Sequence, residues 1–136
     1  MNCLLDTNIC IALINGTSRQ VRRRQIQATA HNIIPHTSSI VAHELWYGVA
    51  KRDRIAQNAN RLIAFLNSAV ALLDYTERDA QAAGDIRAEL ERVGQRIGEY
   101  DTLIAGQAFS RNLILVTTNT LEFTRVNGLV VEDWSL

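Results

Sequence analysis

Short apolar runs alternate along the chain with longer stretches in which apolar residues recur at helical spacing. The runs predict four or five short strands, and the stretches between them are long enough for helices of ten or more residues. Strands that alternate with such helices form β-α-β units and pair in parallel, so we predict an α/β domain with a central parallel sheet. The predicted strands cover residues 3–5, 33–34, 70–73, 113–116 and 129–131, and the longer helices cover 19–30, 37–51, 53–68, 76–94 and 98–111.

Polar residues and glycines mark the ends of the first elements. Asp6 stops the first apolar run, and Thr7 and Asn8 are residue types that cap helix N-termini. Gly16 then closes the first helix. Because Pro35 cannot donate to a strand ladder, it restricts the second strand to a sheet edge, or else it is the first residue of that strand.

Three acidic residues occupy positions where burial is expected. Asp6 ends an apolar strand at the carboxyl edge of the predicted sheet, which is where open α/β sheets bind their ligands. Glu44 and Asp101 lie on helical stripes whose neighbours three and four residues away are mainly apolar. Acids are almost never fully buried unless they are paired or bound to a metal. These three residues therefore form the candidate site.

Two explanations for these acids are open from the residues alone. In the first, each acid pairs with an arginine, and Arg96, Arg111 and Arg125 are the nearest candidates in sequence. In the second, the carboxylates cluster, their mutual repulsion raises their pKa values, and a hard divalent cation such as Mg²⁺ neutralises them. Asn119 follows the strand 113–116, where it either caps a helix or binds a metal-bound water.

The formal net charge is zero, but the charges are unevenly distributed. Residues 1–61 hold eight basic residues and three acids, whereas residues 62–136 hold six basic residues and eleven acids. This asymmetry is compatible with a polyanionic partner for one face, and equally with an ordinary solvated surface. The predicted helix 19–30 carries four of the basic residues, Arg19, Arg22, Arg23 and Arg24.

Composition and cysteine content favour a cytoplasmic globular protein with one domain over residues 1–136. Apolar residues make up 47% of the chain, and no apolar run reaches the ~18 residues of a membrane-spanning helix. No basic segment precedes an apolar stretch at the N-terminus, so we expect no signal peptide. Cys3 and Cys10 stand in apolar surroundings, which predicts buried free thiols. We expect Trp46 and Tyr47 to pack in the core rather than at a dimer interface.

Four ordered segments give the chain a family resemblance. They are LLDTN at 4–8, HELWYG at 43–48, IGEYDTLIAGQA at 97–108 and LVTTNTLEFTRVNGLVVEDW at 115–134. Together they resemble the PIN-domain nucleases and, more closely, the VapC toxins of bacterial toxin–antitoxin pairs. The stretch IRAELERVGQRIG before Asp101 resembles the VapC subgroup that cuts initiator tRNA in its anticodon loop. The resemblance covers essentially the whole chain and implies a three-layer α/β/α PIN-like domain.

The resemblance implies an endoribonuclease that hydrolyses phosphodiester bonds with Mg²⁺, or with Mn²⁺ in its place. The family's acids fall on the three residues already selected, and the fourth position falls on Asn119, where many relatives have Asp. Thr117 matches a hydroxyl residue that orients the acidic cluster. The expected catalytic residues are Asp6, Glu44, Asp101 and Asn119, the expected metal ligands are Asp6, Asp101 and Glu44, and the expected supporting residues are Thr117 and Asn8.

The resemblance also implies the partners. A VapB-like antitoxin blocks the site, the substrate is RNA and above all tRNA, and operator DNA is contacted only through the antitoxin. We expect a homodimer that assembles into a larger toxin–antitoxin complex, and we expect the free toxin to inhibit translation. Two alternatives stay open: a non-toxic PIN-fold nuclease that processes RNA, and a non-catalytic RNA-binding module. The presence of all three acids argues against the second.

Overall fold

The computed structural model describes residues 1–53, 55–68 and 70–136 and places five parallel strands in one sheet. The strand order is β3-β2-β1-β4-β5, so the first strand of the chain lies at the centre. β1 pairs with β2 on one side and with β4 on the other. The predicted parallel α/β fold is therefore confirmed. The strands are β1 (Cys3–Leu5), β2 (Pro35–Ser38), β3 (Ala71–Leu73), β4 (Ile114–Val116) and β5 (Val131–Glu132).

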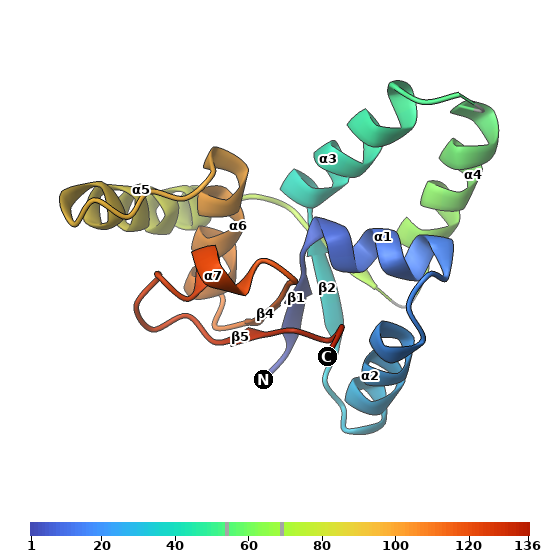
Figure 1. Ribbon diagram of the computed structural model, residues 1–136, viewed down its shortest axis with the longest axis horizontal. Coiled ribbons are helices and arrows are strands. Elements are labelled where there is room, and N and C mark those ends of the chain that lie inside the picture. Colours follow the sequence, from blue (N-terminus) through green and yellow to red (C-terminus); the bar gives the residue numbers. More distant parts are fainter. Residues whose placement is uncertain (54, 69) are drawn as a thin grey trace.

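Helices cover both faces of this sheet. In Figure 1, α5 and α6 lie on one side and α1, α2 and α4 on the other, which is the three-layer arrangement that the resemblance implied. Residue 54, which the predicted helix 53–68 includes, lies outside the described residues. No helix in the described part of the chain is both long and apolar enough to cross a membrane. The helices are α1 (Thr7–Asn15), α2 (Arg19–Ala30), α3 (Ser39–Ala50), α4 (Ile55–Leu66), α5 (Glu77–Arg92), α6 (Glu99–Ser110) and α7 (Thr120–Phe123).

The cap of α1 differs from the prediction. Asp6 is the capping residue, in place of Thr7 or Asn8, and its side chain accepts a hydrogen bond from the Thr7 N–H. The prediction was wrong because aspartate at the end of a strand is itself a favoured N-cap residue. Gly16, with φ 63°, ends the helix in the left-handed conformation that glycine adopts without steric cost.

The second strand is displaced from its predicted position. β2 begins at Pro35 and lies inside the sheet, between β1 and β3. Of the two positions predicted for Pro35, the strand start is correct and the sheet edge is not. The extended segment predicted at 33–34 lies just before the strand, because Cys3 pairs with Pro35. The Ile34 carbonyl oxygen accepts from the Cys3 N–H, but the Ile34 N–H donates to the Asn2 side chain and not to a strand.

The core is centred on the two middle strands. Leu5 and Leu115 are fully buried in the sheet, and Ile104 is fully buried beside it in α6. Cys3 and Cys10 are buried free thiols, as predicted. Burial raises the pKa of each thiol to about 12, so both are inert, structural groups.

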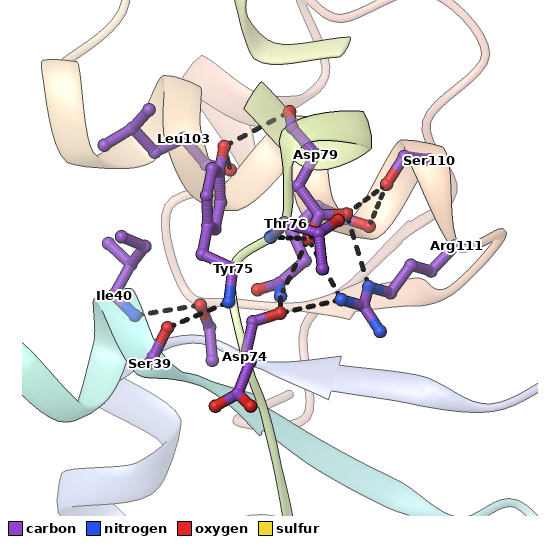
Figure 2. Close-up of polar contacts among 11 residues, drawn as sticks. Ser39, Ile40, Asp74, Tyr75, Thr76, Asp79, Leu103, Ser110 and Arg111 are labelled. Carbon is purple, nitrogen blue, oxygen red and sulfur yellow. Dashed lines mark hydrogen bonds and ion pairs between the residues drawn. The ribbon is translucent and has the colours of Figure 1, made fainter. Parts of the chain in front are cut away.

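A buried ion pair joins the N-terminal end of α5 to the C-terminal end of α6 (Figure 2). Asp79 is 1% exposed, and Arg111 lies 3.0 Å from its Oδ2. The same carboxylate accepts hydrogen bonds from Ser110 and from the N–H and hydroxyl of Thr76. Burial alone would raise the pKa of Asp79, but the hydrogen bonds from Arg111, Ser110 and Thr76 lower it to about 2. Asp79 is therefore a charged structural link between the two helices.

Trp46 and Tyr47 are 40% and 61% exposed, so the prediction that both pack in the core is wrong. α3 buries Val41 and Leu45 instead, and residues one and two positions past Leu45 face away from that side of the helix. The Nζ atom of Lys51 lies 4.8 Å from the centre of the Tyr47 ring. This face of α3 is therefore an exposed aromatic surface.

Candidate active site

β1 and β4 bring the first two polar side chains together. Leu5 lies opposite Val116 in the parallel register, so the next residues, Asp6 and Thr117, leave the same edge of the sheet side by side. The Thr117 hydroxyl donates to Asp6 Oδ2 at 2.7 Å, and the Thr7 N–H donates to Oδ1 at 2.8 Å. Asp6 is only 5% exposed, and burial raises its pKa although both hydrogen bonds act in the opposite direction.

Glu44 reaches the same edge from α3. The Thr7 hydroxyl donates to Glu44 Oε1 at 2.9 Å, so Thr7 contacts Asp6 through its backbone and Glu44 through its side chain. Burial raises the pKa of Glu44, the hydrogen bond from Thr7 lowers it, the charge of Asp6 raises it further, and the adjacent His43 lowers it. The two carboxylates therefore sense each other's charge across one threonine.

Asp101 enters the cluster through Asn119. The Asn119 Nδ2 donates to Asp101 Oδ2 at 3.0 Å and to Glu122 Oε2 at 2.6 Å. Asn119 occupies the N-cap position of α7, yet its side chain makes no capping hydrogen bond and contacts these two carboxylates instead. Its N–H donates to the Thr117 hydroxyl at 3.0 Å, which connects this pair of acids to Asp6.

Asp101 is the most perturbed acid of the cluster. Burial, the adjacent Glu122 carboxyl and the charge of Asp6 raise its pKa to about 7, although the Asn119 hydrogen bond lowers it. The hydrogen bonds from Asp101 and Asn119 lower the pKa of Glu122. Asp101 and Glu122 thus hold one proton between them near neutral pH, mainly on Asp101.

The arginines nearest in sequence neutralise other groups. Arg111 and Arg96 pair with acids of α5, and Arg125 donates to a backbone carbonyl oxygen. Within the part of the chain that the structure describes, no ion pair involves any of the three candidate acids. The explanation by separate salt bridges is therefore wrong, and among the described residues the three acids form one cluster in which none of them has an ion-pair partner.

Two members of the cluster, Thr7 and Glu122, were not predicted. Thr7 was considered only as a helix cap, and its contact with Glu44 spans 37 positions of sequence, which no local pattern reveals. Glu122 stands three residues after Asn119, a spacing that places both on one helix face and could have identified it. Asn8 is exposed on α1, and no hydrogen bond joins its side chain to the acids among the described residues, so the structure does not bring it into the cluster.

The arginine-rich helix lies away from the acids. Figure 1 shows α2 beside the C-terminus, on the side of β1 opposite to α6 and α7. Arg24 lies 3.7 Å from Glu132 in an ion pair, whereas Arg19, Arg22 and Arg23 are exposed. The structure therefore separates this basic surface from the acidic cluster.

Comparison with known proteins identifies the family. The PIN domain model matches residues 3–129. Over 132 residues, which are 97% of both chains, the sequence is 44% identical to the tRNA(fMet)-specific endonuclease VapC of Shigella flexneri. The chain belongs to the VapC group of the PIN-domain family. This VapC-type chain is also 41% identical, over 96% of both chains, to the protein of the same name from Salmonella typhimurium. The resemblance found in the sequence is confirmed.

Solved VapBC structures share the fold of this VapC-type chain. VapBC2 from Rickettsia felis, bound to a DNA fragment from its promoter, matches with a TM-score of 0.91 and 38% identity over 98% of this chain and 99% of that one. DNA-bound VapBC from Salmonella typhimurium matches with a TM-score of 0.89 and 40% identity over 98% of both chains. The likeness therefore extends over the whole α/β/α domain, including every element that contributes to the acidic cluster.

Proposed function

We propose that this chain is a Mg²⁺-dependent endoribonuclease and the toxin of a toxin–antitoxin pair, with initiator tRNA as its preferred substrate. The observation that carries the proposal is the cluster of four carboxylates at the carboxyl edge of the sheet, with no cationic side chain paired to its three central acids among the described residues. The names of the Shigella flexneri and Salmonella typhimurium relatives support the choice of tRNA. Cleavage of that tRNA would inhibit translation.

The donor set fits a hard divalent cation. All four side chains offer oxygen ligands, and burial raises the pKa of Asp6, Glu44 and Asp101, so a cation bound beside them would stabilise their ionised forms. Among the described residues, no three acidic, histidine or cysteine side chains converge at coordination distance, and hydrogen bonds from threonine and asparagine hold the carboxylates. We assign Asp6 and Asp101 as direct ligands of Mg²⁺ or Mn²⁺, and Glu44 as a direct or water-mediated ligand.

The chain's own residues position the reacting groups. A divalent cation held by these acids would supply Lewis-acid chemistry, polarising a phosphoryl oxygen and making a nearby water more acidic. Thr117 fixes the orientation of Asp6, and Asn119 fixes that of Asp101, through the hydrogen bonds described above. Oε1 of Glu44 accepts from Thr7, which leaves Oε2 to accept a proton from the attacking water.

We further propose that the chain acts within a toxin–antitoxin complex. The similar structures from Rickettsia felis and Salmonella typhimurium are VapBC assemblies bound to DNA. By analogy we infer a VapB-like antitoxin that covers the acidic cluster, a toxin homodimer within the complex, and contact with operator DNA through the antitoxin alone.

Purified protein and initiator tRNA test the catalytic proposal. We expect cleavage with Mg²⁺, none in excess EDTA, and at least about 100-fold slower cleavage by Asp6→Asn. Asp85→Asn, which removes an exposed acid of α5, is the control and should cleave like the wild type. Undiminished cleavage in EDTA or by Asp6→Asn would contradict the site.

Expressed without an antitoxin, the wild type should arrest bacterial growth and Asp6→Asn should not. Equal cleavage of unrelated tRNAs would contradict the choice of substrate.

A further inference from the structure

Two aromatic side chains border the acidic cluster. His43 precedes Glu44 on α3, and Tyr100 precedes Asp101 on α6. The centres of the two rings lie 5.5 Å apart, with the ring planes inclined by 41°. The pair therefore spans the gap between the two helices that carry these acids.

Both rings are open to solvent. Tyr100 is 49% exposed and His43 is also exposed, so neither ring contributes its full area to the core. The Tyr100 hydroxyl makes no hydrogen bond within the described residues. Tyr75 provides the contrast, because its hydroxyl donates to the backbone oxygens of Leu103 and Asp79 (Figure 2). Tyr75 joins helices, whereas the Tyr100 ring has exposed surface next to Asp101 in the chain.

Electrostatics limits what can bind next to these acids. When no metal ion is bound, the carboxylates repel the phosphates of RNA, so affinity close to the cut then has to come from an uncharged part of the nucleotide. Unpaired bases stack on aromatic side chains, and this interaction does not depend on charge. A base in a duplex is already stacked on its neighbours and is not available. The ring pair thus favours single-stranded or loop RNA.

We propose that His43 and Tyr100 form a stacking site for one unpaired nucleobase of the RNA, adjacent to the phosphate that is cut. The same face of α3 continues outward with Tyr47 and Lys51, four and eight residues after His43. The Lys51 ammonium over the Tyr47 ring supplies a positive charge farther from the acids. The RNA chain accordingly runs outward from the cleaved phosphate along this face of α3. This inference rests on the ribonuclease function proposed above.

The test compares RNA affinity in variants that differ by one ring. We expect Tyr100→Ala and His43→Ala each to raise the Kd for a fluorescently labelled single-stranded oligoribonucleotide by about fivefold, the low end of the stacking contribution. The measurement is made in EDTA, where the RNA is not cut. Tyr100→Phe keeps the ring and should bind like the wild type. Phe109→Ala is the matched control, since Phe109 is also 49% exposed and lies at the other end of α6.

A second probe identifies the base. Two oligoribonucleotides each carry one abasic position, on one side or the other of the mapped cleavage site. The wild type should bind one of them more weakly than the other, and Tyr100→Ala should bind both equally. If Tyr100→Ala unfolds, Tyr100→Leu replaces it, since leucine keeps apolar volume without an aromatic face.

The outcomes separate this inference from the proposed function. If the wild type cleaves RNA while the ring variants bind like the wild type, the stacking site is wrong and the nuclease stands. If light scattering shows that Tyr100→Ala changes the oligomeric state without changing RNA affinity, the ring pair is a contact between copies and the inference is wrong. A wild type that neither binds nor cleaves RNA overturns both.

Discussion

Replacing Asp101 by asparagine should stabilise the metal-free protein. The pKa of Asp101 is about 7 because the carboxyl is buried beside Glu122 and Asp6. A carboxyl with a higher pKa in the folded than in the unfolded chain holds its proton more tightly when folded, so its ionisation destabilises the fold. Stability therefore falls as the pH rises from about 4 to 7 and stays reduced above 7. The neutral amide of Asp101→Asn removes this penalty.

The size of the effect follows from the pKa. A rise from 3.8 to about 7 corresponds to about 4 kcal/mol at pH 8 if the whole shift is expressed. Because Glu122 shares the proton and water screens the open side of the cluster, we expect about 2 kcal/mol. In a chain of 136 residues this raises Tm by about 6 °C. At pH 4.5 the wild-type carboxyl is already protonated, so the gain should nearly vanish.

Thermal unfolding followed by circular dichroism measures the difference in Tm between Asp101→Asn and the wild type at pH 4.5 and pH 8, in EDTA and in Mg²⁺. Under the proposed function, Mg²⁺ should stabilise the wild type more than Asp101→Asn, because the variant lacks one of the ligands that we assign to the metal. Glu99→Gln is the control, since Glu99 is an exposed acid in the same first turn of α6 and its loss reports the helix-dipole contribution alone. Two results would refute the account by charge repulsion. In the first, Asp101→Asn is no more stable than the wild type in EDTA at pH 8. In the second, the substitution stabilises the protein as much at pH 4.5 as at pH 8.

Three further variants test the fold and the basic helix. Arg111→Met leaves the Asp79 carboxylate buried without its cation and should lower the free energy of unfolding in urea by about 3 kcal/mol at pH 7. Because the pKa of Asp79 is lowered to about 2, this difference should persist above pH 4 and disappear as the pH falls toward 2. Gly106→Ala should cost about 1–3 kcal/mol in the same assay, since a Cβ there would lie 2.6 Å from α5. Arg22→Ala/Arg23→Ala should flatten the log–log salt dependence of RNA binding by ~0.7 for each phosphate that these side chains neutralise in the wild type, and an unchanged slope would exclude phosphate contact by these arginines.

The elements were predictable because their signals are local. The helix over residues 19–30 and the strand within 113–116 depend on periodicity and apolar runs that a short window contains. Which face of a helix packs against its neighbours is not determined by local sequence. α3 presents Trp46 and Tyr47 to solvent because it packs through Val41 and Leu45, and the sequence of α3 offers two apolar sides from which to choose.

The acids were predictable for a different reason. A carboxylate at the end of an apolar strand or on an apolar stripe is costly, and that cost is visible without knowing its neighbours. Glu122 escaped prediction because it stands on the single turn of α7, which has no apolar stripe of its own. Thr7 escaped because only the packing of α3 against α1 brings Glu44 to its hydroxyl.

The choice between ion pairs and a carboxylate cluster depended on where one arginine binds. Arg111 contacts Asp79, 32 positions earlier, and is thereby held at the far end of α6 from Asp101. Had a cation of this chain paired with Asp101, the free protein would gain stability, but that cation would occupy the space that a metal ion and a phosphate require. The uncompensated charge therefore destabilises the free chain, and under the proposed function it leaves the site open to the divalent cation that we assign to it.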